Sequence, residues 1–76
     1  MTFQEQDLEL AKRHVNEGEE HIARVEQLIS QRRISGLPIE QSEGLLAEML
    51  ETLAGHRTHL ELIRKELATP SSLTGL

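Results

Sequence analysis

The chain of 76 residues contains no cysteine, no tryptophan and no tyrosine, and it has a single phenylalanine. Without cysteine it cannot build a disulfide scaffold, a thiolate zinc site or a thiol nucleophile, and such a composition fits a reducing compartment. With one phenylalanine it has no platform on which unpaired bases could stack. These absences exclude small disulfide-stabilised domains, cysteine zinc fingers and proteins that bind single-stranded nucleic acid by stacking.

Basic residues are also scarce, and they are scattered along the chain. Eight Lys and Arg oppose thirteen Asp and Glu, which gives a formal net charge of −5. A chain of this charge is repelled by a nucleic-acid backbone, and it lacks the basic amphipathic face with which a helix attaches to a membrane surface. We therefore expect no nucleic-acid partner and no membrane partner.

Long apolar runs and catalytic motifs are missing too. The first residues are acidic rather than basic, and no segment approaches the roughly eighteen successive apolar residues of a membrane span. The chain is too short for a conventional enzyme pocket, and it contains neither a nucleophile with a base at helical spacing nor a glycine-rich phosphate loop. We expect a soluble, cytoplasmic protein that is not an enzyme.

What the sequence does contain is a regular spacing of apolar residues. In the first half, steps of three and four alternate through Leu8, Ala11, Val15, Gly18, Ile22, Val25 and Ile29. The second half repeats the pattern through Ile39, Ser42, Leu46, Met49, Leu53, His56, Leu60, Ile63 and Leu67. This is the heptad repeat of a coiled coil, whose a and d positions form the seam between helices. The repeat predicts an all-α protein with two long helices.

The residues around the two repeats indicate where the helices begin and end. Thr2 and Glu5 have the spacing of a capping box, while Gly36 favours a helix end and Pro38 favours the first turn of a new helix. The last residues carry Pro, Ser and Gly without periodicity. The predicted elements are a helix over 3–34, a turn over 35–38, a helix over 39–68 and a flexible tail over 69–76.

The short turn also predicts how the helices pack. A connection of about four residues forces the second helix to fold back, so the chain is expected to form an antiparallel two-helix coiled-coil hairpin. Residues whose numbers sum to about 71 then share a layer of the seam. Gly18 is expected to make room for Leu53, and His56 is expected to face Val15 inside the seam.

A single seam between two helices stabilises a chain of this length poorly. Ordering each residue costs about 1 to 2 kcal/mol, and a two-helix seam leaves half of each apolar side chain in water. Because further apolar side chains lie beside the seam, we predict that two hairpins form a homodimeric four-helix bundle. The expected dimer interface contains His21, Leu28, Leu45 and Leu50. A hairpin completed by a helix of another protein remains an alternative.

The four histidines are the candidate functional residues of the sequence. His14, His21 and His59 occupy the g flank of the seam, and the layer rule places His14, His56 and His59 at nearly the same height. Zinc accepts three imidazoles and one carboxylate, which Glu17 could supply. Against a metal site, the chain contains neither a Glu-x-x-His nor a His-Glu-x-x-His motif, and histidines on the flanks of facing helices approach each other in any case.

His56 has two further interpretations of its own. A neutral histidine in the seam can hydrogen-bond a neighbour and set the register of the helices, as polar seam residues do. Alternatively it is a pH sensor, because burial disfavours the imidazolium ion and protonation would then loosen the bundle as the pH falls.

Several segments together resemble a group of short helical-hairpin proteins from alphaproteobacteria, especially rhizobial relatives. The resemblance is carried by His14–Glu19, Ile22–Arg24, Leu28–Ile29, Leu45–Leu46, Leu53 and His56–Leu60. It covers nearly the whole chain up to Leu67, but Leu37–Ile39 replaces the polar helix start of that group. The resemblance implies a helical hairpin and no particular activity.

Two functions remain in view from the sequence. The first is a non-enzymatic structural or protein-interaction module that acts through the surface of a helical bundle. The alternative is a metal-responsive or pH-responsive sensor that uses the histidine cluster of His14, His56 and His59.

Overall fold

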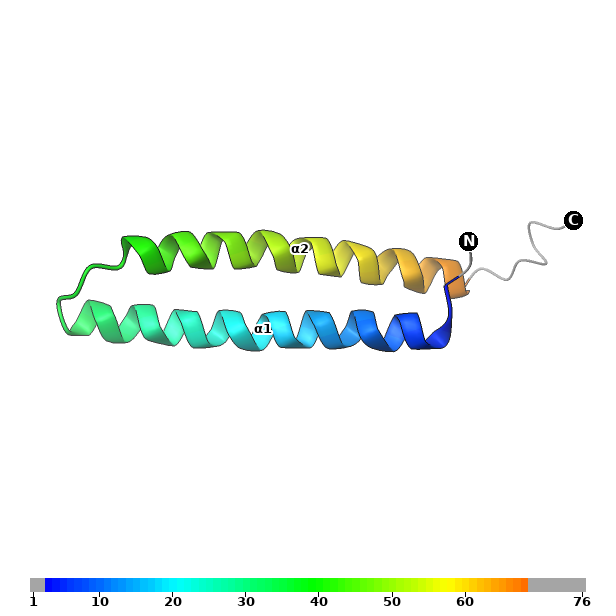
Figure 1. Cartoon of the computed structure of the whole chain (residues 1–76), viewed down its shortest axis with the longest axis horizontal. Helices are drawn as coiled ribbons and strands as arrows, with labels where there is room; N and C mark the ends of the chain where they lie inside the picture. The colour runs from blue at the N-terminus through cyan, green and yellow to red at the C-terminus, as the bar shows by residue number, and fades with distance from the viewer. Residues whose placement is uncertain (1–2, 69–76) are drawn as a thin grey trace, which may run out of the picture.

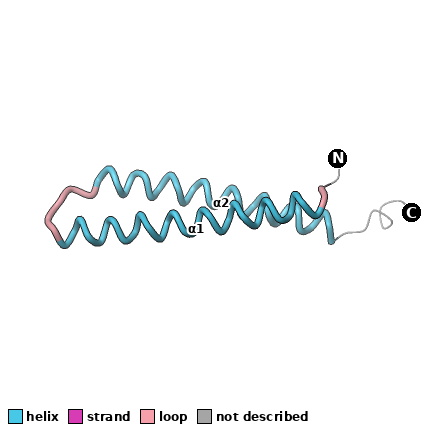
Figure 2. Tube along the Cα trace, turned by 60° about the horizontal axis from the view of Figure 1, so that its bottom comes forward, coloured by secondary structure: helices cyan, strands magenta, loops and turns pink. Residues whose placement is uncertain are grey.

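The chain forms two long helices that pack antiparallel as a hairpin, as Figure 1 shows. The computed structural model describes residues 3–68, with α1 over Glu5–Ile34 and α2 over Glu40–Ala68. The turned view in Figure 2 shows one loop joining the helices at one end of the molecule. The prediction of an all-α hairpin is therefore confirmed. The predicted tail over 69–76 lies outside the described residues.

The first helix begins two residues later than predicted. Its N-cap is Gln4, whose backbone N–H donates a hydrogen bond of 2.8 Å to the Asp7 carboxylate. This contact satisfies a donor that the first turn of a helix leaves unpaired, and it places negative charge at the positive end of the helix dipole. The carboxylate at the third helical position is thus Asp7 rather than Glu5 of the predicted box, whose other member, Thr2, lies outside the described residues.

The turn lies where the sequence placed it, because Gly36 reverses the chain. Gly36 has a φ of 72°, in the left-handed region that glycine adopts without steric cost. Its N–H donates to the Arg33 carbonyl, and the Leu37 N–H donates to the Arg32 carbonyl at 2.8 Å. This pair of bonds is a Schellman motif and satisfies the last carbonyls of α1. The second helix then begins at Glu40, so Pro38 precedes it instead of lying in its first turn.

The buried side chains of residues 3–68 all come from the predicted seam. They are Ala11, Val15, Ile22, Ile29, Leu53, Leu60 and Ile63. The layer rule also holds at the centre, where a Cβ built on Gly18 would lie 3.1 Å from Cδ1 of Leu53. The core is nevertheless thin, because among the large side chains of the described range only Ile63, at 1% exposure, and Leu53, at 3%, are almost fully enclosed.

Candidate functional site

The two sides of the hairpin differ in chemistry, and one of them is closed by ion pairs between the helices. Arg57 of α2 contacts Glu19 of α1 at 3.0 Å, and Arg33 of α1 contacts Glu43 of α2 at 3.4 Å. Leu50 lies seven residues after Glu43 and seven before Arg57, so it falls in the same row. Glu19 and Arg33 lie in one row on α1, and Glu43, Leu50 and Arg57 lie in one row on α2. We call these five residues together the charged flank.

The opposite side carries histidines and leucines. Residues seven apart again define the rows, which contain His14, His21 and Leu28 on α1 and Leu45, Thr52 and His59 on α2. We call these six residues the histidine flank. Within the described range, all four ion pairs of the chain involve residues of the charged flank or of the surface next to it. In the described range, no ion pair therefore joins the two helices on the histidine flank.

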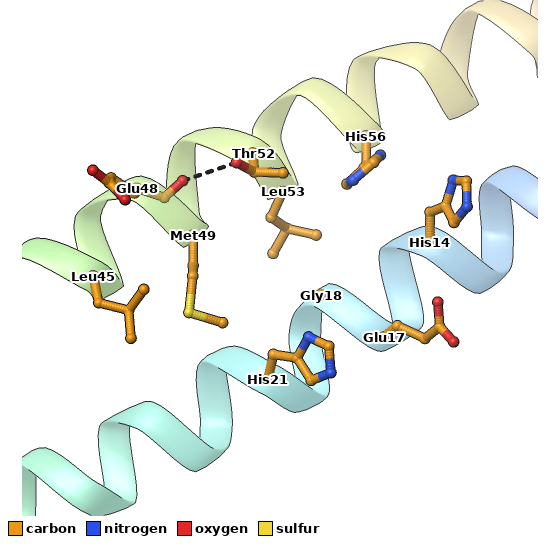
Figure 3. Close-up of a pocket in the computed structure, with 10 residues that line it drawn as sticks. All are labelled: His14, Glu17, Gly18, His21, Leu45, Glu48, Met49, Thr52, Leu53 and His56. Atoms are coloured by element: carbon orange, nitrogen blue, oxygen red, sulfur yellow. Dashed lines mark hydrogen bonds between the residues drawn. The ribbon is translucent and has the colours of Figure 1, made fainter. Parts of the chain in front are cut away.

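An open hollow of about 320 Å³ lies in the middle of the histidine flank (Figure 3). Gly18 of α1 lines it without a side chain, and Leu53 and Met49 of α2 form an apolar wall. The remaining lining consists of His14, Glu17, His21, Leu45, Glu48, Thr52 and His56. The Thr52 hydroxyl is occupied, since it donates to the Glu48 carbonyl of its own helix at 3.0 Å.

The close approach of two histidines is the most distinctive contact of this hollow. The ring centroids of His14 and His56 lie 5.2 Å apart, with an angle of 46° between the ring planes. Both residues are half-buried rather than enclosed, and no polar residue in the described range is buried. His56 is therefore not the enclosed core histidine expected from the seam pattern, because its ring turns toward His14 at the edge of the hollow.

His59 is engaged elsewhere. Its ring packs edge-on against Phe3, with centroids 5.8 Å apart and an interplanar angle of 83°, which is a favourable geometry for two aromatic rings. Sequence reasoning missed this contact because it placed Phe3 inside the first helix, whereas the chain becomes helical only at Glu5. The late N-cap at Gln4 leaves Phe3 free to turn toward the end of α2.

The predicted zinc ligands are consequently brought together only in part. His14 and His56 meet, Glu17 lies in the same hollow, and His59 contacts Phe3. Among residues 3–68, no three His, Asp or Glu side chains are arranged so that they could hold a metal ion. The geometry offers a pair of imidazoles, which is half of the ligand set of a closed zinc site.

The structure also divides the predicted interface residues between the two flanks. His21, Leu28 and Leu45 belong to the histidine flank, whereas Leu50 belongs to the charged flank. Leu45 and Leu50 are both 48% exposed and Leu28 is 44% exposed, so none of these leucines is covered by the hairpin itself. The three residues of the histidine flank thus lie on one side of the hairpin and Leu50 lies on the other, so the interface that contains all four stays a prediction.

No family model, no curated protein and no solved structure matches this chain. The resemblance to rhizobial-type hairpin proteins stays a prediction. Neither helix of the described range combines the length and the apolar character that crossing a membrane requires.

Proposed function

We propose that this chain is a non-enzymatic protein-interaction module that uses the histidine flank as a helical-bundle surface. The observation that carries the proposal is the uneven distribution of exposed leucines. Four of them lie on or beside the histidine flank, namely Leu10, Leu28, Leu45 and Leu62. Clusters of exposed apolar side chains on a small protein mark places where another surface packs.

The local chemistry supports binding rather than catalysis. The hollow is open and bounded mainly by apolar surface from Leu45, Met49 and Leu53. In the described range its histidines form no ion pair with a carboxylate. A general base usually needs a second group that orients it. A row of leucines beside a groove is instead the pattern that receives an amphipathic helix.

The test is photo-crosslinking in living cells with a benzoylphenylalanine placed at one of two leucines. Position 45 lies on the histidine flank and position 50 on the charged flank, and the two native side chains are equally exposed. We expect a discrete crosslinked species from position 45 and none above background from position 50. Equal labelling from both positions, or none from either, would contradict the proposal.

A second candidate function, sensing of zinc or of pH, is supported by the contact between His14 and His56. Two imidazoles on one tetrahedral zinc ion, with Zn–N bonds of about 2.0 to 2.1 Å, hold their ring centroids roughly 5 Å apart, which is close to the observed spacing. Calorimetric titration with zinc should then release heat and raise the melting temperature, and His56→Leu should abolish both effects. If zinc produces neither effect and His56→Leu leaves the acid-side melting profile unchanged, the chain is not such a sensor.

A further inference from the structure

The histidine flank belongs to a second series of residues with alternating steps of three and four, beside the buried seam. On α1 the series runs through Leu10, His14, Glu17, His21, Arg24 and Leu28. On α2 it runs through Leu45, Glu48, Thr52, Gly55, His59 and Leu62. All of these residues are exposed except the half-buried His14. A second heptad series on one side of a helix pair has the spacing of another coiled-coil seam.

We propose that a second copy of this chain covers the histidine flank, with the two loops at the same end of a four-helix bundle. The inference rests on the proposed interaction function and names its partner. A two-fold axis along the hairpin lays α1 of one copy over α2 of the other without changing the height of any residue. Residues that share a layer within one hairpin therefore also meet between the two copies.

This arrangement makes each layer of the second series chemically compatible. Leu10 lies over Leu62 of the second copy, and Leu28 lies over Leu45 of the second copy, so both ends of the interface are apolar. Between them, His14 meets His59, Glu17 meets Gly55, and His21 meets Thr52. In these layers no carboxylate opposes another carboxylate, and no Arg or Lys opposes another Arg or Lys.

The layer that decides between arrangements contains Arg24 and Glu48. Neither side chain forms an ion pair inside the described part of the hairpin. With the loops at the same end, Arg24 of each copy meets Glu48 of the other, which gives two intermolecular pairs. With the loops at opposite ends, the leucines would still meet, but Arg24 would lie over His14 and would have no carboxylate opposite it. Charge complementarity therefore favours the first arrangement.

The size of the surface is also adequate for a dimer. The leucine layers at the two ends of the interface, Leu10 and Leu28 on α1, lie about 27 Å apart along the helix, and two helices packed 8 to 10 Å apart present a face about 18 Å wide. Such a face covers on the order of 500 Å² on each copy, so the dimer buries about 1,000 Å² in total, which is the lower bound for a specific protein interface. A second copy would also enclose the leucines that the hairpin leaves in water.

Charge reversal tests the partner and the arrangement together. We expect sedimentation of the full chain at micromolar concentration to show a dimer, and Arg24→Glu or Glu48→Arg alone to weaken dimerisation about tenfold. An equimolar mixture of the two variants should recover wild-type affinity, because the mixed dimer places opposite charges in both layers. If folding is coupled to dimerisation, the melting temperature should fall in each variant and recover in the mixture.

Arg13→Glu and Glu51→Arg are the matched controls, because these substitutions change the charge in the same way but lie on the outer faces of α1 and α2. They should leave the dimer unaltered, alone and mixed. A helical wild-type chain that remains monomeric would overturn the second copy as partner, and the crosslink from position 45 would then decide separately whether the flank binds another protein. A dimer whose Arg24 and Glu48 variants behave like the controls, or fail to recover on mixing, would overturn the proposed arrangement.

Discussion

Glycine has opposite roles at two positions of this chain. Gly36 has a φ of 72° and ends α1, whereas Gly44 lies inside α2 with no atom near the place of a Cβ. A side chain in the left-handed conformation costs about 1 to 2 kcal/mol, while alanine in a helix interior is more favourable than glycine by about 0.8 to 1.0 kcal/mol. The same change of residue should therefore have opposite signs at the two sites.

We expect Gly36→Ala to lower the free energy of unfolding by about 1 kcal/mol and Gly44→Ala to raise it by about 0.5 to 1 kcal/mol. Urea denaturation of both variants, at one protein concentration, measures the two shifts. Each variant is the control for the other, because the chemical change is identical. Shifts of the same sign would contradict the assignment of the turn to Gly36.

The core depends strongly on single side chains. Ile63 is 1% exposed and contributes to the central cluster of the hairpin. Removing most of its side chain in Ile63→Ala should cost about 2 to 5 kcal/mol, which is a large fraction of the stability of a small domain. Leu50→Ala, on the charged flank, is the control and should cost less than about 1 kcal/mol. Thermal melting followed by circular dichroism compares the two, and equal losses would show that Ile63 is less enclosed than the structure has it.

At the scale of the helices, the ends and the seam have different origins. The seam follows from the heptad repeat, so residues such as Val15, Ile22 and Leu60 could be assigned to the core from spacing alone. The start of α1 could not be placed correctly, because Gln4 with Asp7 and Thr2 with Glu5 are both plausible caps. The Gln4 cap lies next to Phe3, whose contact with His59 is tertiary and is not contained in the local sequence.

The charged flank connects the two helices through half-exposed ion pairs, and their contribution should be small. Arg57→Gln removes the contact with Glu19 and should lower stability by about 0.2 to 1 kcal/mol. The difference between variant and wild type should shrink as salt is added, because salt screens exposed charges. Denaturation at low and high salt tests this, and a loss that salt does not reduce would indicate a packing role for Arg57 instead.

At the scale of the whole molecule, the hairpin leaves Leu10, Leu28, Leu45 and Leu62 about half exposed beside a thin core. Dimerisation through the histidine flank predicts that stability depends on protein concentration, since association favours the folded state by mass action. The melting temperature of the wild-type chain should rise over a hundredfold range of concentration. In Leu45→Glu this rise should disappear, while Leu50→Glu should retain it. A wild-type melting temperature independent of concentration would mean that the hairpin is stable alone.

The candidate site shows how far spacing reaches at this scale. The layer rule placed His14, His56 and His59 at one height, and His14 does meet His56. It could not reveal that His59 turns to Phe3, nor that a hollow lies between His14, His21 and Leu53, because both depend on side-chain directions. The two flanks could have been predicted from the heptad positions, since ion pairs such as Glu19 with Arg57 join residues on the same side of the seam.

The sequence by itself determined that this protein is a pair of helices folded back at Gly36. The heptad spacing and the freedom of glycine to adopt the left-handed conformation are local properties of the sequence, so both can be identified without the tertiary structure. Only the tertiary structure decided where the first helix starts, which histidines touch and which leucines share a side. Those features depend on how the two helices are rotated about their own axes when they pack. That rotation is set by contacts between the helices and cannot be derived from either helix alone.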